Sequence, residues 1–240
     1  MVNEHTLVVT KDVEEQGAPL NAKDLQSFWG VIVAQSGLGY YNSGRLSGAS
    51  QPHKHMQVIP AGIGRAAANG AGVATCTTDD TPVCPVHTLV MRALTQRGDV
   101  AGERQCADSV GTDDTFCVPE FPFVHACVGV GDVEHLSASC SVDTCSAGAA
   151  LERKYRALLH RVGLPCDDPT TPVTPDQSYN VLLTTAWMMV VPRVAECSGP
   201  VSINSMGFAC TMFVKNDDHL DYLKDHGPLR ILQDVTRANP

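Results

Sequence analysis

The spacing of apolar residues predicts a mixture of strands and amphipathic helices. Residues 5–10 are rich in Val, Leu and Thr, a composition typical of a strand. Apolar residues at positions 25–33 recur with the i, i+3, i+4, i+7 spacing of one helix face, and Asn21 or Asp24 is suited to cap that helix. The same spacing predicts a helix over residues 151–162.

Other elements follow from apolar runs and from the residues that interrupt them. Residues 40–51 combine two Gly with four Ser or Asn residues, so we expect a loop that exposes its backbone. A turn at Thr184 and Thr185 divides the apolar segment 179–192 into two expected strands. We also expect strands at 53–59, 118–130 and 212–215, a helix at 86–95, and two helices over 217–235 separated at Gly227 and Pro228. Strands and helices do not alternate regularly, which favours an α+β fold over a doubly wound sheet.

The domain organisation follows from length and composition. A chain of 240 residues fits a single domain spanning 1–240. Residues 61–115 mix Gly, Ala, Thr, Asp and Cys, so apart from the helix named above we expect a variable insertion there. Residues 165–175 contain four prolines, which predicts an extended connection to a C-terminal part at 176–240.

Charge narrows the classes of partner. The formal net charge of −9 argues against a broad nucleic-acid surface, because phosphate backbones select for clustered Lys and Arg. A single anionic small molecule remains compatible with this charge, because backbone N–H groups and a few cations can hold it. No apolar run approaches the roughly 20 residues of a membrane-spanning helix, and the first residues lack the features of a secretory signal. We therefore expect a cytoplasmic protein that binds neither nucleic acid nor membranes.

Cysteine spacing bears on metal binding. The chain has ten cysteines, and in a cytoplasmic protein we expect them to be reduced thiols rather than a disulfide framework. Cys84 lies three residues before His87, and neither this spacing nor that of Cys140 and Cys145 matches a paired Cys-x-x-Cys zinc knuckle. We therefore expect no metal site at these cysteines.

The segment with the clearest chemical character is NSGRLSGASQPHKHMQVIP, residues 42–60. His53, His55 and Gln57 are two residues apart, so on a strand they project from one face. Lys54 points the other way, where we expect a solvated side chain. The preceding Gly-rich loop would offer backbone N–H groups to a phosphate. From these residues alone, three interpretations stay open: a covalent nucleotidyl-histidine, a metal pair, and surface histidines.

The segment HKHMQVIP resembles the His-x-His-x-Gln signature of the transferase branch of the histidine-triad superfamily. YNSGRLSGASQPHKHMQ is similar to the diadenosine tetraphosphate phosphorylases, also called ATP adenylyltransferases. HTLVVTKDVEEQGAPL, YNVLLTTAWMMVVPR and INSMGFACTMFVKNDDHLDYLKDHGPLRILQDV resemble other parts of that family. The resemblance implies a histidine-triad-like α+β fold, in which an antiparallel sheet is flanked by helices and the part at 176–240 completes a nucleotide site.

The resemblance also implies a role for each motif residue. His55 would be the nucleophile that carries AMP, His53 would orient it and contact phosphate, and Gln57 would hold a nonbridging phosphoryl oxygen. An amide can donate to that oxygen but cannot act as a general acid. The other residues that the resemblance assigns to substrate binding are Asn42, Gly48, Ala49, Ser50, Gln51, Asn204, Ser205, Met206, Thr211 and Lys215. By composition alone, Met206 would be core filler.

The implied reaction is phosphorolysis of diadenosine tetraphosphate to ATP and ADP through AMP on His55, or dinucleotide synthesis in reverse. The implied partners are diadenosine tetraphosphate, ATP, ADP and phosphate, with no tightly bound cofactor, a divalent cation such as Mg²⁺ on the polyphosphate, and a monomer or homodimer. One alternative is a hexose-phosphate uridylyltransferase, although that relative has zinc ligands and a Pro where this chain has Lys54. The other is a truncated nucleotide-binding protein without turnover, because the family has a further segment ahead of the part matching His5.

Overall fold

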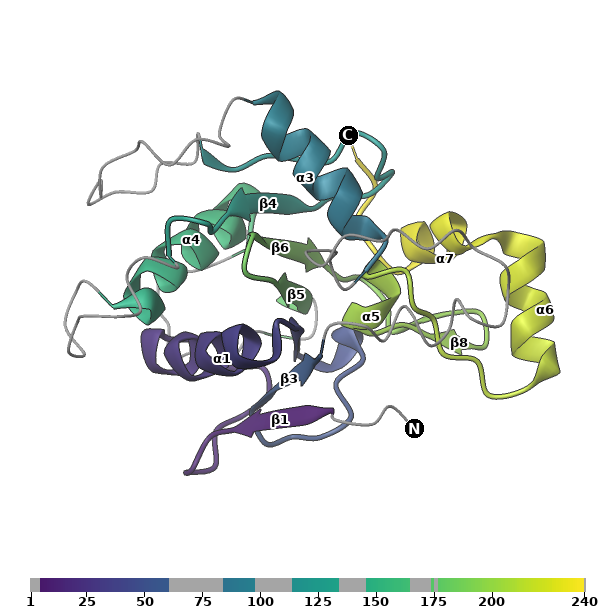
Figure 1. Ribbon diagram of the computed structural model, residues 1–240. Helices are drawn as coiled ribbons and strands as arrows, with labels where there is room; N and C mark the ends of the chain where they lie inside the picture. Colours follow the sequence, from purple (N-terminus) through teal and green to yellow (C-terminus); the bar gives the residue numbers. More distant parts are fainter. Residues whose placement is uncertain are drawn as a thin grey trace.

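The centre of the molecule is one antiparallel sheet of six strands with helices on both faces (Figure 1). The computed structural model describes residues 5–60, 84–97, 114–133, 146–164, 174 and 177–239. The strands lie in the order β1-β3-β2-β5-β6-β4. Their bounds are Thr6–Val9 (β1), Leu38–Ser43 (β2), His55–Ile59 (β3), Ala126–Gly129 (β4), Tyr179–Leu183 (β5) and Trp187–Pro192 (β6). The expected α+β class with an antiparallel sheet is confirmed.

One face of the sheet is covered by α1 (Ala22–Gln35) and α4 (Ala147–Arg161), whose apolar sides share a core with the strands. Asn21 caps α1: its side chain accepts from the backbone N–H of Asp24, and the Asp24 carboxylate accepts from the N–H of Asn21. This reciprocal capping box satisfies backbone donors that a helix start leaves unpaired. The expectation of a cap at Asn21 or Asp24 is confirmed, because both take part.

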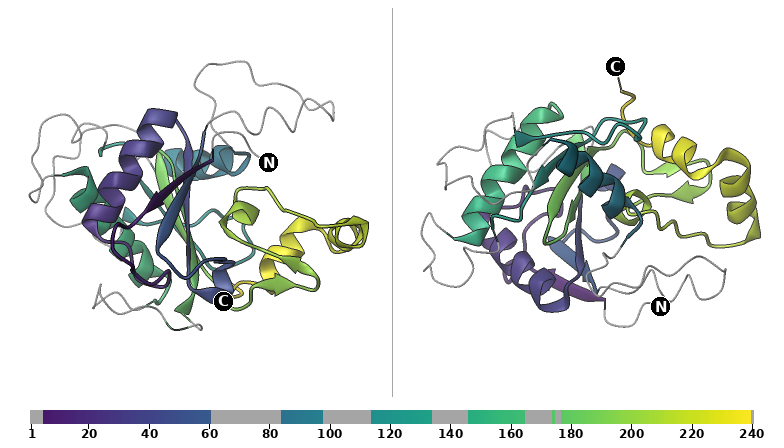
Figure 2. Two further views of the ribbon diagram at one scale, coloured as in Figure 1. Left: turned by 90° about the horizontal axis from the view of Figure 1, so that it is seen from below. Right: turned by 45° about the horizontal axis from the view of Figure 1, so that its top comes forward.

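The opposite face is covered by α3 (Val86–Gln96) and by the C-terminal part of the chain. Figure 2 shows α1 and α4 on one side of the sheet and the yellow C-terminal helices on the other. The C-terminal elements are the hairpin of β7 (Cys197–Ser198) and β8 (Val201–Ser202), α5 (Ser205–Phe208), α6 (Asp217–His226) and α7 (Pro228–Asp234). No helix in the described ranges has the length and apolar content needed to cross a membrane.

Strand register places the motif on the face that the C-terminal part covers. Gln57 in β3 lies opposite Leu7 in β1 and Tyr40 in β2, and residues opposite each other in an antiparallel pair share a face. The C-terminal layer does not reach the β1 edge, because Leu7 is 55% exposed whereas Tyr40 is 4% exposed. Gln57 therefore lies between a closed core and an open sheet edge.

Several elements were predicted correctly. The first strand and the strand pair at 179–192 are present as expected. The helix expected at 86–95 is α3, the one expected at 151–162 is α4, which begins earlier, and the two expected after residue 217 are α6 and α7. Residues 61–83 and 98–113 of the expected insertion, and nearly all of the proline-rich connection, lie outside the described residues.

Three expectations about strands were wrong. Residues 40–43 belong to strand β2 and not to a loop, because pairing with β3 and β5 buries all six β2 residues despite their weak strand preference. Residues 212–215 form no strand, since they have no neighbouring strand to pair with among the described elements. The strand expected over 118–130 is limited to Ala126–Gly129.

Candidate active site

His55 stands at the start of β3 with one ring nitrogen tied to the backbone. Its Nδ1 lies 2.8 Å from the carbonyl oxygen of His53. A carbonyl oxygen can only accept, so Nδ1 carries a proton, and in the neutral ring Nε2 therefore keeps its lone pair. The residue is only 8% exposed, so this hydrogen bond holds the ring in a largely enclosed position.

The backbone of His55 is held by Gln16, a residue that the sequence analysis did not single out. Where β2 and β3 separate, the Gln16 amide nitrogen donates to the carbonyl oxygens of Asn42 (2.9 Å) and His55 (3.2 Å). Its amide oxygen accepts from the N–H of His55 at 2.9 Å. One buried glutamine therefore replaces strand pairing at this point. A lone Gln in a polar loop gave no spacing signal.

His53 contributes to the site through its backbone as well as through its ring. Its carbonyl oxygen fixes His55, as described above, while its Nε2 lies 3.0 Å from Thr10 Oγ1 and 3.2 Å from the carbonyl oxygen of Asp12. The Asp12 oxygen can only accept, so Nε2 donates to it. The His53 ring is thus anchored to the loop after β1.

Gln57 is bonded through its amide oxygen. The Tyr40 hydroxyl donates to Gln57 Oε1 at 2.9 Å, and His5 Nε2 lies 3.3 Å from the same hydroxyl. The His5 and Tyr40 rings are stacked with centroids 6.1 Å apart. Burial raises the pKa of Tyr40 to about 12, because the phenolate would lose its hydration. The hydroxyl therefore keeps its proton at neutral pH.

Lys54 lies on the opposite face from Gln57, and the expectation that it is solvated was wrong. It is 1% exposed, and its Nζ lies 2.6 Å from Asp24 Oδ2 and 3.1 Å from Glu14 Oε2. Nζ also donates to the carbonyl oxygen of Pro19 at 2.8 Å. Because Asp24 belongs to α1, this ion pair fixes the motif strand to the helix layer.

Two residues expected to bind substrate, Asn42 and Ser205, contact each other directly. Asn42 Oδ1 accepts from the Ser205 N–H at 3.0 Å and from Asn180 Nδ2 at 2.8 Å, and the Ser205 hydroxyl lies 2.7 Å away. Asn42 is only 3% exposed. Its amide oxygen is therefore committed to a buried network that joins β2 to β5 and to the C-terminal part.

Arg193 organises the far side of this network and was not identified from the sequence. It is fully buried, and its Nη1 donates to Asn180 Oδ1 at 2.6 Å and to the carbonyl oxygen of Ile203 at 2.9 Å. Its Nε donates to the carbonyl oxygen of Val235 at 3.1 Å. Burial lowers the pKa of Arg193 to about 9, so the side chain stays charged at neutral pH. A buried cation thus joins β6 to the C-terminal part.

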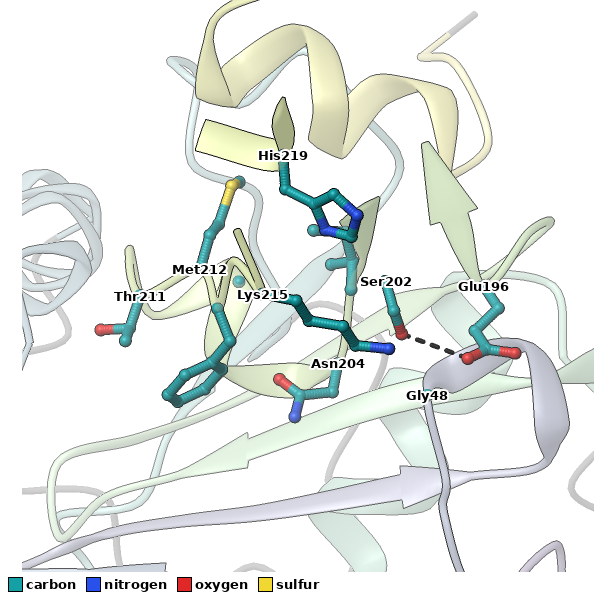
Figure 3. A pocket seen from close by; sticks show the side chains of 11 residues that line it. Gly48, Glu196, Ser202, Asn204, Thr211, Met212, Lys215 and His219 are labelled. Carbon is teal, nitrogen blue, oxygen red and sulfur yellow. Dashed lines mark hydrogen bonds between the residues drawn. The ribbon is translucent and has the colours of Figure 1, made fainter. Parts of the chain in front are cut away.

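A pocket of about 260 Å³ lies between the Gly-rich loop and the C-terminal part (Figure 3). Lys215 reaches across it toward Ser202, whose hydroxyl donates to Glu196 at 3.1 Å. Four of the residues expected to bind substrate line the pocket, namely Gly48, Asn204, Thr211 and Lys215. The other lining residues, which the sequence analysis missed, are Glu196, Ser202, Ile203, Gly207, Met212, Phe213 and His219.

Four further residues expected to bind substrate do not line this pocket, namely Met206, Ala49, Ser50 and Gln51. Met206 is buried in the core that α7 and the sheet share. Ala49 is half-buried, and Ser50 and Gln51 are exposed in the loop before β3. Gly48 has a φ of +81°, and a Cβ there would lie 2.8 Å from the carbonyl oxygen of Ile203. The loop therefore packs directly against the pocket wall.

Comparison with known proteins covers most of the chain. Residues 1–71 match the Ap4A phosphorylase N-terminal domain, and residues 119–238 match the ATP adenylyltransferase C-terminal domain. Diadenosine 5',5'''-P1,P4-tetraphosphate phosphorylase 2 of Saccharomyces cerevisiae is 27% identical over 94% of this chain and 62% of its own length. Protein APA1 of the same yeast is 22% identical over 91% of this chain and 60% of its own length. The chain thus spans about three fifths of the length of these relatives.

Solved structures support the fold. The crystal structure of yeast Ap4A phosphorylase Apa2 matches 100% of this chain and 72% of its own chain, with a TM-score of 0.66 at 23% identity. The structure of Apa2 in complex with Ap4A gives the same TM-score at 22% identity, over 71% of that chain. The ATP adenylyltransferase domain alone accounts for half of the 240 residues, and the chain belongs to the ATP adenylyltransferase (Ap4A phosphorylase) family.

Proposed function

We propose that the protein cleaves diadenosine tetraphosphate by phosphorolysis through a covalent AMP on His55. In the first step, the Nε2 lone pair attacks the α-phosphorus of one AMP half, and the bond from that phosphorus to the polyphosphate oxygen breaks, releasing ATP. In the second step, a phosphate oxygen attacks the same phosphorus, the P–N bond breaks, and ADP leaves. The reverse sequence makes the dinucleotide.

The observation that carries this proposal is the state of the His55 ring. With Nδ1–H bonded to the His53 carbonyl oxygen, Nε2 is the nitrogen that can act as a nucleophile. The carbonyl also stabilises the positive charge that the ring gains when Nε2 bonds to phosphorus, because Nδ1–H then becomes a stronger donor. No separate base is needed, since a neutral imidazole attacks without losing a proton.

Gln57 explains why phosphate, and not water, would be the preferred acceptor. Its amide N–H, which donates to none of the described residues, can stabilise a nonbridging phosphoryl oxygen, but the amide cannot protonate a leaving group or remove a proton from water. ATP leaves without protonation, and phosphate is already an anionic nucleophile. A site built with an amide at this position therefore favours transfer between phosphates.

The pocket beside the Gly-rich loop is suited to the other half of the dinucleotide. Lys215 supplies a positive charge there, and Asn204 and Thr211 supply polar groups. We also propose that the polyphosphate brings its own divalent cation, such as Mg²⁺. Among the described residues, no group of three or more His, Cys, Asp or Glu side chains is arranged to hold a metal ion.

The test is intact-protein mass spectrometry after brief exposure to diadenosine tetraphosphate without phosphate. We expect an added AMP mass on the unmodified chain and its loss when phosphate is added, with release of ADP. His55→Ala should abolish the adduct. His160→Ala is a matched control, because His160 is exposed on α4, on the opposite face of the sheet, and this variant should form the adduct at the normal rate.

Two outcomes would contradict the proposal. An adduct that persists in His55→Ala would assign the nucleophile to another residue. Binding of the dinucleotide without any adduct would indicate a nucleotide-binding protein without turnover.

A further inference from the structure

The amide of Gln57 has two ends with opposite effects on a phosphoryl group. Its NH₂ group can stabilise a negative oxygen, whereas its carbonyl oxygen would repel it. An amide rotates readily about its last torsion, so its orientation depends on the surrounding hydrogen bonds. Which end faces His55 is therefore a question about the neighbours of Gln57.

Tyr40 is the neighbour that decides this orientation. Its hydroxyl has one proton, and it lies between Gln57 Oε1 at 2.9 Å and His5 Nε2 at 3.3 Å. The shorter distance fits the donated bond, so the proton points at Gln57 and the His5 ring supplies an N–H to the hydroxyl oxygen. In the opposite arrangement the Tyr40 hydroxyl would donate its hydrogen bond to His5 Nε2 and accept one from the Gln57 NH₂ group. The Gln57 carbonyl oxygen would then face the phosphate.

The Tyr40 ring is also rigid enough to act as a clamp. It is 4% exposed and belongs to the core cluster under the C-terminal layer. Burial, which raises its pKa to about 12, keeps the hydroxyl protonated over the working range of pH. A hydroxyl fixed in place and always protonated can impose one orientation on a neighbouring amide.

We propose that Tyr40, supported by His5, is a positioning residue that turns the NH₂ group of Gln57 toward the phosphoryl group at His55. This inference rests on the proposed function, in which Gln57 holds a nonbridging oxygen. Neither Tyr40 nor His5 needs to touch the substrate, because both act through the Gln57 amide. The motif alone does not reveal them: Tyr40 is on another strand, and His5 lies before the first one.

The test is a double-mutant cycle with Tyr40→Phe and Gln57→Ala. We expect Gln57→Ala to slow formation of the AMP adduct by about 100-fold, as for loss of one oxyanion donor. Tyr40→Phe should slow it by roughly tenfold in the normal background and by less than about twofold when Gln57 is already Ala, because the two residues then share one effect. His5→Ala should act in the same direction and also lose its effect in the Gln57→Ala background.

Tyr41→Phe is the matched control. Tyr41 is the adjacent tyrosine, but its hydroxyl donates to the carbonyl oxygens of Gln16 and Ala18 and its side chain belongs to the other core cluster. It should lower the free energy of unfolding, and any effect on the rate should be equal in both Gln57 backgrounds. An equal slowing by Tyr40→Phe in the two backgrounds would overturn the proposal, because it would show that Tyr40 acts through packing.

A second readout separates this proposal from the proposed function. The dissociation constant of AMP is measured by calorimetry for each variant of the same cycle. This measurement needs no turnover. Coupling in AMP binding without any covalent adduct would reject phosphorolysis and retain the positioning role. Adduct formation without coupling between Tyr40 and Gln57 would retain phosphorolysis and reject the positioning role. The absence of both the adduct and AMP binding would reject both proposals.

Discussion

Lys54 is the motif residue whose surroundings differ most from the sequence prediction. Strand alternation correctly placed its side chain away from the His55 and Gln57 face. It could not show that Asp24 and Glu14 meet the ammonium group there, because both partners come from segments far away along the chain. A lysine between two polar residues is usually solvated, and only the tertiary structure reveals this exception.

Replacing Lys54 should be strongly destabilising. Lys54→Met keeps the length of the side chain but leaves the buried Asp24 carboxylate without its cation, and we expect a loss of about 3–5 kcal/mol in the free energy of unfolding. Urea denaturation measures this loss. The control is Lys224→Met, which removes an exposed pair with Asp221 and should change stability by less than about 0.5 kcal/mol. A loss below about 1 kcal/mol in Lys54→Met would show that the ion pair does not anchor the strand.

At the scale of elements, long periodic segments were predictable and short ones were not. The helices α4 and α6 and the β5–β6 pair follow directly from apolar spacing and turn residues. The hairpin of β7 and β8 and the one-turn helix α5 have two to four residues each, too few for any period to show. Strand β2 was hidden because Gly39, Asn42 and Ser43 are poor strand formers, and pairing on both sides overrides that preference.

The loop after β2 contains a glycine whose replacement gives a testable prediction. Gly48→Ala combines a positive φ with a Cβ 2.8 Å from the Ile203 carbonyl oxygen, so we expect a loss of at least about 2 kcal/mol. It should also raise the KM for the dinucleotide, because Gly48 lines the pocket. Gly163→Ala is the control, with φ of +70° and no atom within 4 Å of the added Cβ. It should cost about 1 kcal/mol and leave KM unchanged. Equal effects of the two variants on stability and KM would contradict the role of the close approach.

At the scale of the whole molecule, the site lies where two layers and one open edge meet. Strands β2 and β5, the Gly-rich loop and the C-terminal part are joined through Asn42, Asn180 and Ser205, and Arg193 closes the network behind them. The sequence indicated the motif and, through the family resemblance, several pocket residues. It did not indicate Gln16 or Arg193, because their function depends on backbone carbonyl and N–H groups that only the folded chain brings together.

Two histidines that must stay neutral lie on the side of the sheet that carries Gln57. His87 Nδ1 accepts from Trp187 Nε1 at 3.0 Å, and His125 Nε2 accepts from the Val118 N–H at 2.8 Å. Protonating either nitrogen would bring two donors together. Burial lowers the pKa of both side chains, because the cation would lose its hydration.

Because both histidines must stay neutral in the folded chain, we expect the protein to lose stability in acid. In the unfolded chain a histidine takes up its proton near pH 6.5, whereas His87 and His125 in the folded chain stay neutral to a lower pH. Between those values the unfolded state binds more protons, so the free energy of unfolding should fall as the pH falls below about 6.5. Urea denaturation at a series of pH values measures the slope. His87→Gln combined with His125→Gln keeps acceptor oxygens that do not titrate, and we expect a shallower slope, whereas the exposed His160→Gln should keep the normal one. A double variant with an unchanged slope would show that the acid sensitivity arises from other groups.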